Sequence, residues 1–177
     1  MDLIRSSIKI KIMKKNTSII INEMISYYAN DPRRVNHFLK VYSFSKSIGE
    51  LEKLDEEMQY ILEIAAIMHD IGIKISEEKY NSSAGNYQEI EGPPVAREML
   101  EMLGFDEKII ERVCFLIGHH HTYSKIDNID YQILIEADFL VNIYEDEIKY
   151  DSIVSIKDKY FKTKAGINFL EKLYLSE

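Results

Sequence analysis

Apolar residues recur every three or four positions along most of the chain, which is the period of an amphipathic α-helix. Strict alternation of apolar and polar residues, the pattern of a half-buried strand, is weak. Its clearest instance is the segment IKIKI at residues 8–12, which fits a short extended piece. The pattern therefore predicts an all-α fold.

Capping residues and helix breakers divide this pattern into about six to eight helices. Residues 73–90 are polar and irregular, and we expect them to form the longest loop. The expected helix boundaries are Thr17 or Ser18 as the first cap, Asp31-Pro32 to about Leu54, Asp55 to about Gly72, Pro93-Pro94 to Gly104, Asp106 to the histidines at 119–121, Asp130 as the sixth cap, and about Ser152 as the start of one or two more helices.

Composition indicates one globular domain over residues 1–177. Hydrophobic residues make up 46% and charged residues 29% of the chain, and no linker-like stretch or repeat divides it. The single cysteine, Cys114, lies in an apolar run, which excludes an internal disulfide and suits a small buried side chain. No segment reaches the roughly 18 uncharged apolar residues of a membrane helix, and the start of the chain lacks a secretory h-region. We therefore expect a cytoplasmic protein without a membrane partner.

The net charge of -8, from 22 basic and 30 acidic residues, limits the class of partner. An acidic surface repels a polyanion, so we expect no nucleic-acid polymer as a partner. A small anionic substrate stays compatible, because a metal ion and a few local cations can reverse the field inside a pocket. The basic cluster from Arg5 to Lys15 could contact an anionic surface, but a solvated terminus is the expected reading. The sequence does not determine the oligomeric state.

Four of the expected helices place a histidine or a carboxylate on the apolar face that should form the core. On the second helix, His37 heads a row of apolar residues at spacings of four and three. The rows are His37 with Val41, Phe44, Ile48 and Leu51; Leu62 and Ala65 or Ala66 with His69 and Asp70; Ile109, Val113 and Leu116 with His120; Ile110, Cys114 and Ile117 with His121; and Leu134 and Val141 with Asp138.

These buried carboxylates predict a metal site. A lone histidine on an apolar face is usually a hydrogen-bonded core residue, but an unpaired buried carboxylate costs several kcal/mol and needs a cation. No lysine or arginine lies in these rows. A divalent ion would compensate Asp70 and Asp138 together and use the histidines as neutral donors. Imidazole and carboxylate ligands without thiolate suit Mn, Fe, Ni, Co, Zn or Mg.

The order His37, then His69-Asp70, then Asp138 resembles the HD-domain superfamily of metal-dependent phosphohydrolases. The matching segments are RRVNHFLKVYSFSKSIGE, AAIMHDIG and LIEADFLVN, and they lie between about residues 30 and 145. The resemblance implies a single-domain orthogonal helical bundle, with the first and last helices packed on this motif-bearing core. It also implies that His37, His69, Asp70 and Asp138 surround a divalent metal ion, and that the substrate is a phosphate mono- or diester, often a nucleotide.

Relatives that hold two or more metals add a histidine four residues before a glycine, followed later by a His-His pair. Here Gln88 stands four residues before Gly92, and the pair is His120-His121 or, in the alternative register, His119-His120. We expect one tightly held ion and a second that is weak or depends on substrate. Nearby residues that could supply a further oxygen ligand are Glu89 and Glu91.

We hypothesise that the metal lowers the pKa of a bound water and polarises a phosphoryl oxygen. Asp70 would ligate the metal and orient that water. His120 and His121 would act as further ligands, proton donors or phosphate contacts. The expected substrate contacts are Lys74, Arg33 and Arg34, each with a solvated surface charge as its alternative, together with Gln88, and Tyr80 and Tyr87 if they stack on a base instead of packing.

The sequence thus predicts a hydrolase that acts on a small phosphate ester, with a nucleotide as the expected substrate. One alternative is a metal- and nucleotide-binding sensor without significant turnover, and another is a helical interaction protein whose histidines pack in a metal-free core. A deoxynucleoside monophosphate, a dinucleoside polyphosphate, a cyclic nucleotide and a non-nucleotide phosphate all stay open as substrates, because fold and ligands do not fix the substrate.

Overall fold

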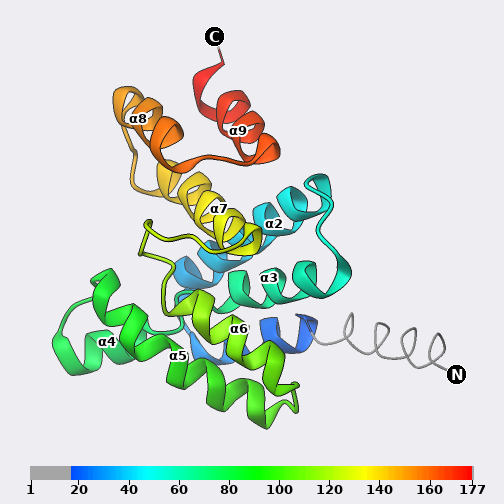
Figure 1. Cartoon of the computed structure of the whole chain (residues 1–177). Coiled ribbons are helices and arrows are strands. Elements are labelled where there is room, and N and C mark those ends of the chain that lie inside the picture. The colour runs from blue at the N-terminus through cyan, green and yellow to red at the C-terminus, as the bar shows by residue number, and fades with distance from the viewer. Residues whose placement is uncertain (1–16, 177) are drawn as a thin grey trace, which may run out of the picture.

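The computed structural model describes residues 17–176, and in this range it contains helices and no strands (Figure 1). The all-α prediction is confirmed. The expected extended piece at 8–12 and the basic cluster from Arg5 to Lys15 lie outside the described residues. The helical segments are residues 17–27, α2 (Pro32–Leu51), α3 (Glu56–Met68), α4 (Ile73–Tyr80), α5 (Gly85–Met102), α6 (Glu107–Ile117), α7 (Ile129–Glu145), α8 (Tyr150–Tyr160), α9 (Lys164–Leu170) and the π-helical turn η1 (Glu171–Leu175).

Helix α3 lies at the centre of the packing. It contacts α2, α6 and α7, and every residue from Tyr60 to Met68 is buried. Figure 1 shows α4, α5 and α6 at one end of the molecule and α8 and α9 at the other, with α2, α3 and α7 between them. Because α3 is surrounded by other helices, the residues that follow its carboxyl end also lie in the interior.

Two of the predicted caps have the expected geometry. The Asp31 side chain accepts a hydrogen bond from the backbone N–H of Arg34 and Pro32 opens α2, while the Asp55 side chain accepts one from Met58. Thr17 and Ser18, which were expected to cap the first helix, both lie within its helical residues. For α7 the predicted cap is wrong.

The cap of α7 is Asn128, whose side chain accepts a hydrogen bond from the N–H of Ile129 at 2.8 Å. Asp130 lies in the first turn and forms an ion pair with Arg112 of α6 instead. A cation from a neighbouring helix thus holds the carboxylate that was expected to cap. Leu51 also departs from expectation: it ends the apolar row of α2 but is 59% exposed.

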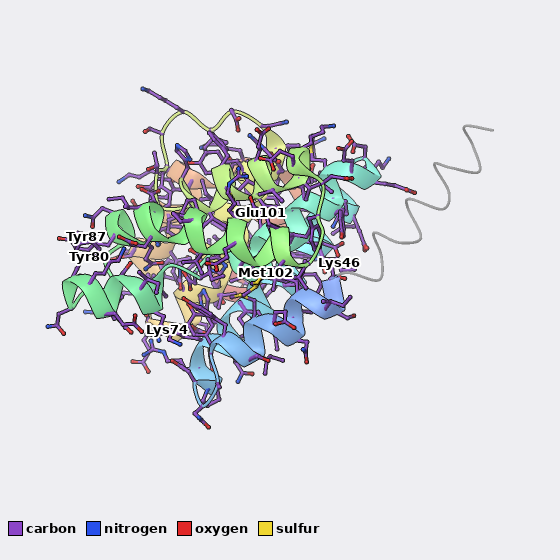
Figure 2. The ribbon with its side chains drawn as sticks, turned by 90° about the horizontal axis from the view of Figure 1, so that it is seen from below. Lys46, Lys74, Tyr80, Tyr87, Glu101 and Met102 are labelled. Carbon is purple, nitrogen blue, oxygen red and sulfur yellow. The ribbon has the colours of Figure 1, made fainter. Side chains whose placement is uncertain are left out.

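Residues 73–90 form helix α4 and the start of α5 instead of a loop. The expectation failed because these helices are joined by polar contacts and not by an apolar row. The carboxylate of Glu91 accepts hydrogen bonds from Lys79 Nζ at 2.6 Å and Tyr80 Oη at 2.7 Å. Tyr80 also stacks on Tyr87 of α5, with ring centroids 4.2 Å apart (Figure 2).

Pro93 and Pro94 lie inside α5 and do not open it. Proline is common at the first position of a helix because it lacks an N–H group, and that rule placed the expected start eight residues too late. Within α5 the two rings remove two helical donors. The carbonyl oxygen of Pro93 accepts a hydrogen bond from Cys114 Sγ of α6 at 3.4 Å, and α5 and α6 pack against each other.

The chain after α7 packs back onto α7 through a buried carboxylate. Glu136 is fully buried and accepts hydrogen bonds from the backbone N–H groups of Lys162 and Thr163 and from the side chain of Gln132. These bonds fasten the segment between α8 and α9 to the middle of α7. No helix of residues 17–176 is both long enough and apolar enough to cross a membrane.

Candidate metal centre

The turn that follows α3 carries the His-Asp doublet. α3 ends one residue earlier, and His69 and Asp70 lie on the turn that leads into α4. A Cβ atom at Gly72 would lie 2.6 Å from the carbonyl oxygen of Gln88 and 2.8 Å from the nitrogen of Gly92. Glycine at this position therefore allows α5 to pack directly against the doublet.

Two tyrosines at the end of the first helix, Tyr27 and the next residue Tyr28, hold the same turn. Tyr28 Oη donates to the carbonyl oxygen of Asp70 at 2.6 Å, and Tyr27 Oη donates to that of Ile71 at 3.1 Å. Burial raises the pKa of both hydroxyls, that of Tyr27 to about 12, so both keep their protons at neutral pH. The first helix thus fixes the backbone on which Asp70 stands.

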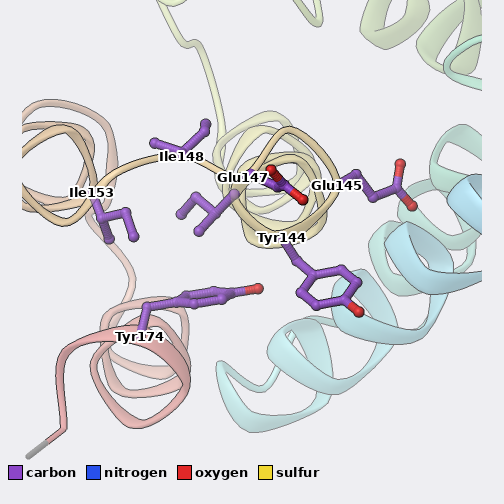
Figure 3. Close-up of a pocket in the computed structure, with 7 residues that line it drawn as sticks. Tyr144, Glu145, Glu147, Ile148, Ile153 and Tyr174 are labelled. Atoms are coloured by element: carbon purple, nitrogen blue, oxygen red, sulfur yellow. The ribbon is translucent and has the colours of Figure 1, made fainter.

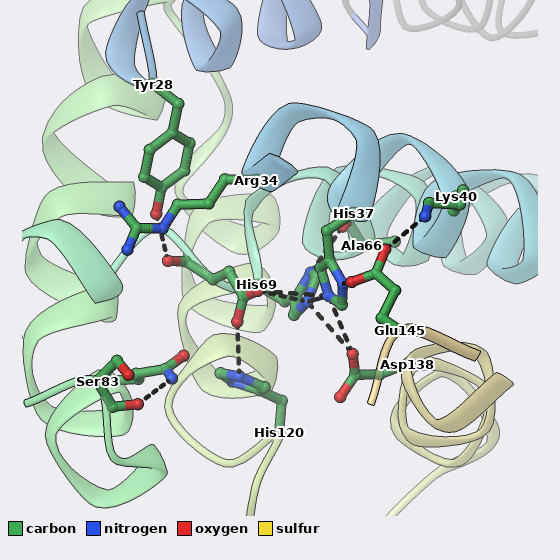
Figure 4. Close-up of polar contacts among 12 residues, drawn as sticks. Tyr28, Arg34, His37, Lys40, Ala66, His69, Ser83, His120, Asp138 and Glu145 are labelled. Atoms are coloured by element: carbon green, nitrogen blue, oxygen red, sulfur yellow. Dashed lines mark hydrogen bonds and ion pairs between the residues drawn. The ribbon is translucent and has the colours of Figure 1, made fainter. Parts of the chain in front are cut away.

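Four side chains from three segments converge at this turn. His37 comes from α2, His69 and Asp70 from the turn, and Asp138 from α7 (Figure 4). His37 Nε2 lies 3.2 Å from His69 Nε2, 3.2 Å from an oxygen of Asp138 and 3.4 Å from an oxygen of Asp70. His69 Nε2 lies 3.3 Å from that Asp70 oxygen and 3.6 Å from Asp138. The structure therefore brings together the four residues that the sequence singled out.

The rings of His69 and His120 have the orientation of metal ligands. The Nδ1 atom of His69 lies 2.9 Å from the carbonyl oxygen of Ala66, and that of His120 lies 2.7 Å from the carbonyl oxygen of Ile117. A carbonyl oxygen only accepts, so in the neutral rings the proton is on Nδ1 and the Nε2 lone pair faces the cluster. Metal-bound histidines are held by outer hydrogen bonds of this kind.

A second cluster shares Asp70 with the first. Donor atoms of Asp70, His120 and His121 all lie within 4.8 Å of one another. Within the described structure, Nε2 of His120 and Nε2 of His121 are buried and have no hydrogen-bond partner. Two such nitrogens are suitable electron-pair donors for a cation. His119 points elsewhere: its Nδ1 bonds to the carbonyl oxygen of Phe115 and its ring stacks on that residue. The geometry thus favours the His120-His121 register.

The electrostatics of both clusters suit a cation. Burial raises the pKa of Asp138, but hydrogen bonds and charges from the protonated forms of His37 and His69 outweigh it and hold that pKa well below the ordinary range. Burial likewise raises the pKa of Asp70, but the charge of His69 and the hydrogen bonds from His120 and His69 together outweigh it and hold that pKa well below the ordinary range. Both carboxylates are therefore anionic at neutral pH. Burial lowers the pKa of His121 to about 4, so His121 is a neutral donor.

The three cations expected to bind substrate do not contact either cluster in the described part of the chain. Lys74 is exposed and lies over the ring of Tyr27, 5.0 Å from its centroid (Figure 2). Arg33 is exposed on the first turn of α2. Arg34 is paired with Glu77 of α4 at 2.6 Å. Tyr80 and Tyr87, which were considered as a platform for a base, stack on each other.

Gln88 is buried beside the doublet. Its side-chain nitrogen donates to the carbonyl oxygen of Ser83 at 2.6 Å, and its side-chain oxygen has no hydrogen-bond partner among the described residues. The backbone of Gln88 touches Gly72, two residues after Asp70, and Gly85, one turn earlier in α5, packs on the ring of His121. Gln88 therefore lies in the wall between the doublet and the second cluster.

The two glutamates expected as further oxygen ligands are engaged in other contacts. Glu89 accepts hydrogen bonds from the backbone N–H of His121 at 3.0 Å and from Thr122 Oγ1 at 2.9 Å. Glu89 therefore holds the histidine turn in place instead of reaching the cluster. Glu91 is paired with the α4 side chains described above.

The structure adds one residue that the sequence reasoning missed. Glu145, the last residue of α7, places Oε2 2.9 Å from His37 Nδ1 and Oε1 2.5 Å from Lys40 Nζ. The signal that could have found it is its spacing of seven residues from Asp138, which puts both carboxylates on one face of α7. On its other side the end of α7 borders a cavity of about 450 Å³ (Figure 3). The cavity is lined by Ile143, Tyr144, Glu145, Glu147, Ile148, Ile153 and Tyr174.

Comparisons with known proteins agree with this geometry. A family model described as the HD domain matches residues 34–161, which include every residue of both clusters. The crystal structure of a predicted HD superfamily hydrolase from an uncultured Thermotogales bacterium matches with a TM-score of 0.65 and 24% sequence identity, over 90% of this chain and 86% of that chain. No curated protein matches the chain. The structural match shows a shared fold, as the sequence resemblance implied.

Proposed function

The chain belongs to the HD domain family, whose members are generally metal-dependent phosphohydrolases, and on that premise we propose that it hydrolyses a small phosphate ester. The observation that carries the proposal is the convergence of His37, His69, Asp70 and Asp138 from three segments on one point. For the substrate we propose a nucleotide.

In this proposal a first divalent ion is held by His37, His69, Asp70 and Asp138, and a second, weaker ion by Asp70, His120 and His121. Such ions supply a water nucleophile at neutral pH and polarise the phosphoryl oxygen. The donor set is two carboxylates and imidazoles with no thiolate, which suits Mn, Fe, Ni, Co, Zn or Mg. The fit rests on the unpartnered Nε2 atoms and on the absence of any lysine or arginine from the described clusters.

In the proposed reaction Asp70, His121 and His120 have different roles. Asp70 belongs to both clusters and would orient the attacking water. The neutral His121 serves as a donor to a cation and not as an acid, since its pKa is lowered to about 4. His120, whose Nε2 lies 3.6 Å from Asp70, would be a ligand of the second ion. Where that ion is absent, it would contact the substrate phosphate or, with its ring protonated, donate a proton to the leaving oxygen.

We propose that Lys74, in preference to Arg33 and Arg34, binds the substrate phosphate. Lys74 has no ion-pair partner among the described residues, so its charge is available to an anion. Arg34 already shares its charge with Glu77 and is the less suitable contact. Arg33 is exposed on the first turn of α2 and has no ion-pair partner among residues 17–176. The unpartnered oxygen of Gln88 is an acceptor for a substrate hydroxyl or amino group.

The test is a substrate panel combined with metal analysis. Protein purified without a His-tag is assayed for metal content, then against phosphomonoesters, phosphodiesters and nucleotides with added Mn²⁺ or Co²⁺. We expect turnover that requires the ion, that chelator removes, and that Asp138→Asn abolishes. The matched control is Asp146→Asn, an exposed aspartate just after α7, which should retain activity.

One specific observation favours a second candidate, a metal- and nucleotide-binding sensor without turnover. Gln88 stands where relatives with two metals have a histidine, and its side chain bonds to Ser83. Metal binding and nucleotide binding without hydrolysis of any member of the panel would establish the sensor and overturn the enzyme. A protein that binds neither would be a helical interaction protein.

A further inference from the structure

We propose that Glu145 is a positioning residue of the metal centre, which fixes the tautomer and the orientation of His37 so that Nε2 faces the ion. The inference rests on the proposed function, because it concerns how one of the proposed ligands is held. It is carried by contacts on α2 and α7 that lie outside the His-Asp motif.

One face of α7 supplies two carboxylates to the two ring nitrogens of His37. Asp138 approaches Nε2 at 3.2 Å, and Glu145 approaches Nδ1 at 2.9 Å (Figure 4). Seven residues separate the two carboxylates, which is roughly 10 Å along the helix and almost two full turns. The imidazole is therefore held from both sides by a single rigid element.

His37 differs in this respect from the other histidines of the cluster. His69 and His120 hydrogen-bond through Nδ1 to carbonyl oxygens three residues earlier in their own segments, at 2.9 and 2.7 Å. These acceptors are local, neutral and present in any sequence. His37 depends instead on an anionic side chain from another helix, and an anionic acceptor makes the opposite nitrogen a stronger metal donor.

The carboxylate of Glu145 is itself held in place. Its second oxygen accepts a charge-assisted hydrogen bond from Lys40, one turn after His37 on α2, and its side chain is 15% exposed. Both oxygens are thus engaged by the same helix that carries His37. In Figure 3 the Glu145 carboxylate points away from Tyr174 and Ile153 of the cavity, toward α2. A glutamate side chain that moves freely on the surface would not have these contacts.

The experiment compares Zn²⁺ affinity, measured by competition with a chromophoric chelator, in the wild-type protein and three variants. Glu145→Gln keeps the size of the side chain and removes its charge, and Glu145→Ala removes the acceptor. Removing an outer-shell carboxylate typically weakens metal binding by about 10–100-fold, and we expect a loss in this range for both. Glu147→Gln is the matched control: it removes the same charge from an exposed residue of the same cavity wall that does not touch His37.

A second readout separates positioning from a structural role. In ¹H–¹⁵N spectra of the zinc-loaded protein, the Nδ1 proton of His37 should be shifted downfield and protected from exchange. We expect both properties to be lost in Glu145→Gln and kept in Glu147→Gln. A structural role alone would lower the unfolding temperature of the metal-free protein and leave the affinity of the folded fraction unchanged.

The outcomes distinguish this inference from the proposed function. If the wild-type protein binds Zn²⁺ and both Glu145 variants bind it equally well, Glu145 is not a positioning residue and the proposed metal site stands. If all variants, Glu147→Gln included, lose affinity to the same degree, the effect is one of general charge and the inference is overturned. A wild-type protein that binds no divalent ion overturns the proposed function, and this inference with it.

Discussion

Asp70 is the residue on which both clusters depend. One of its oxygens lies 3.4 Å from His37 Nε2 and 3.3 Å from His69 Nε2, and the other lies 3.6 Å from His120 Nε2. Its backbone is fixed independently of its side chain, because Tyr28 donates to the carbonyl oxygen. Removal of the carboxylate should therefore leave the turn in place.

We expect Asp70→Ala to lose the bound metal and to lower turnover by at least about 100-fold, because the ligand shared by both sites is gone. Metal content and steady-state rates measure the loss, and circular dichroism checks that helical content is kept. A variant with full activity would remove Asp70 from the mechanism. If the fold is lost as well, Asp70→Asn, which keeps the shape of the side chain, takes its place.

Arg112 joins α6 to the start of α7. It forms paired hydrogen bonds with Asp130, which is 3% exposed, and with Asp127, which is 46% exposed. We expect Arg112→Gln to lower the free energy of unfolding by about 3 kcal/mol, because it leaves the buried carboxylate of Asp130 without its cation. Asp127→Asn should cost less than about 1 kcal/mol, since that pair is exposed to water. Urea titrations of the two variants measure both values.

The contribution of the Arg112–Asp127 pair has a defined pH dependence. The hydrogen bonds from Arg112 lower the pKa of Asp127 below its ordinary value of 3.8. A carboxylate with a lowered folded-state pKa stabilises the fold above its unfolded value, and this contribution is lost as pH falls through the folded value. The stability gap between the wild type and Asp127→Asn should therefore close below about pH 4. A gap that widens toward acid would contradict the assignment.

At the scale of elements, Gly72 sets the distance between the doublet and α5. A Cβ there would meet backbone atoms of Gln88 and Gly92, which cannot rotate away as a side chain can. We expect Gly72→Ala to cost about 3 kcal/mol and to weaken metal binding, because α5 must move from the turn. Gly104→Ala is the control: its φ of +74° makes alanine strained by about 1–2 kcal/mol, but no atom lies within 4 Å of the new Cβ. Metal affinity should fall in the first variant only.

The elements that the sequence predicted correctly are those with a continuous apolar row and a capping aspartate. α2 and α3 have both, and their caps Asp31 and Asp55 are where the pattern placed them. α4 has neither, because Glu91, Lys79 and Tyr80 join it to α5 through polar contacts that only a packed structure shows. A hydrophobic period does not indicate a helix that contacts its neighbour through polar side chains.

The same limit applies to the candidate site. His37, His69, Asp70 and Asp138 could be singled out because each interrupts an apolar row, so a local pattern revealed all four. Glu145 shares a face of α7 with Asp138, but its contact with His37 joins residues 108 positions apart. That contact depends on how α2 crosses α7, which no local pattern contains. A residue that contacts a proposed metal ligand from another helix can therefore be identified only from the structure.

For the whole molecule, the proposed ion would link segments that are far apart in the chain. The first cluster joins α2, the turn after α3 and α7, and the second joins that turn to the one after α6. The chain carries a net charge of -8, and two anionic carboxylates meet in its interior. A divalent cation there compensates buried charge and connects elements from most of the fold.

Because the folded clusters do not exist in the unfolded chain, a bound ion stabilises the native state by mass action. A free Zn²⁺ concentration about 100 times the dissociation constant adds about 2.7 kcal/mol, which for a chain of this length raises the unfolding temperature by about 5–10 °C. Differential scanning fluorimetry with and without the ion measures the shift. It should be absent from Asp138→Asn and unchanged in His119→Gln, whose ring stacks on Phe115 outside both clusters. A shift that survives in full in Asp138→Asn would place the ion elsewhere, at the second cluster or on this acidic surface, and the four-residue centre would not be where the metal binds.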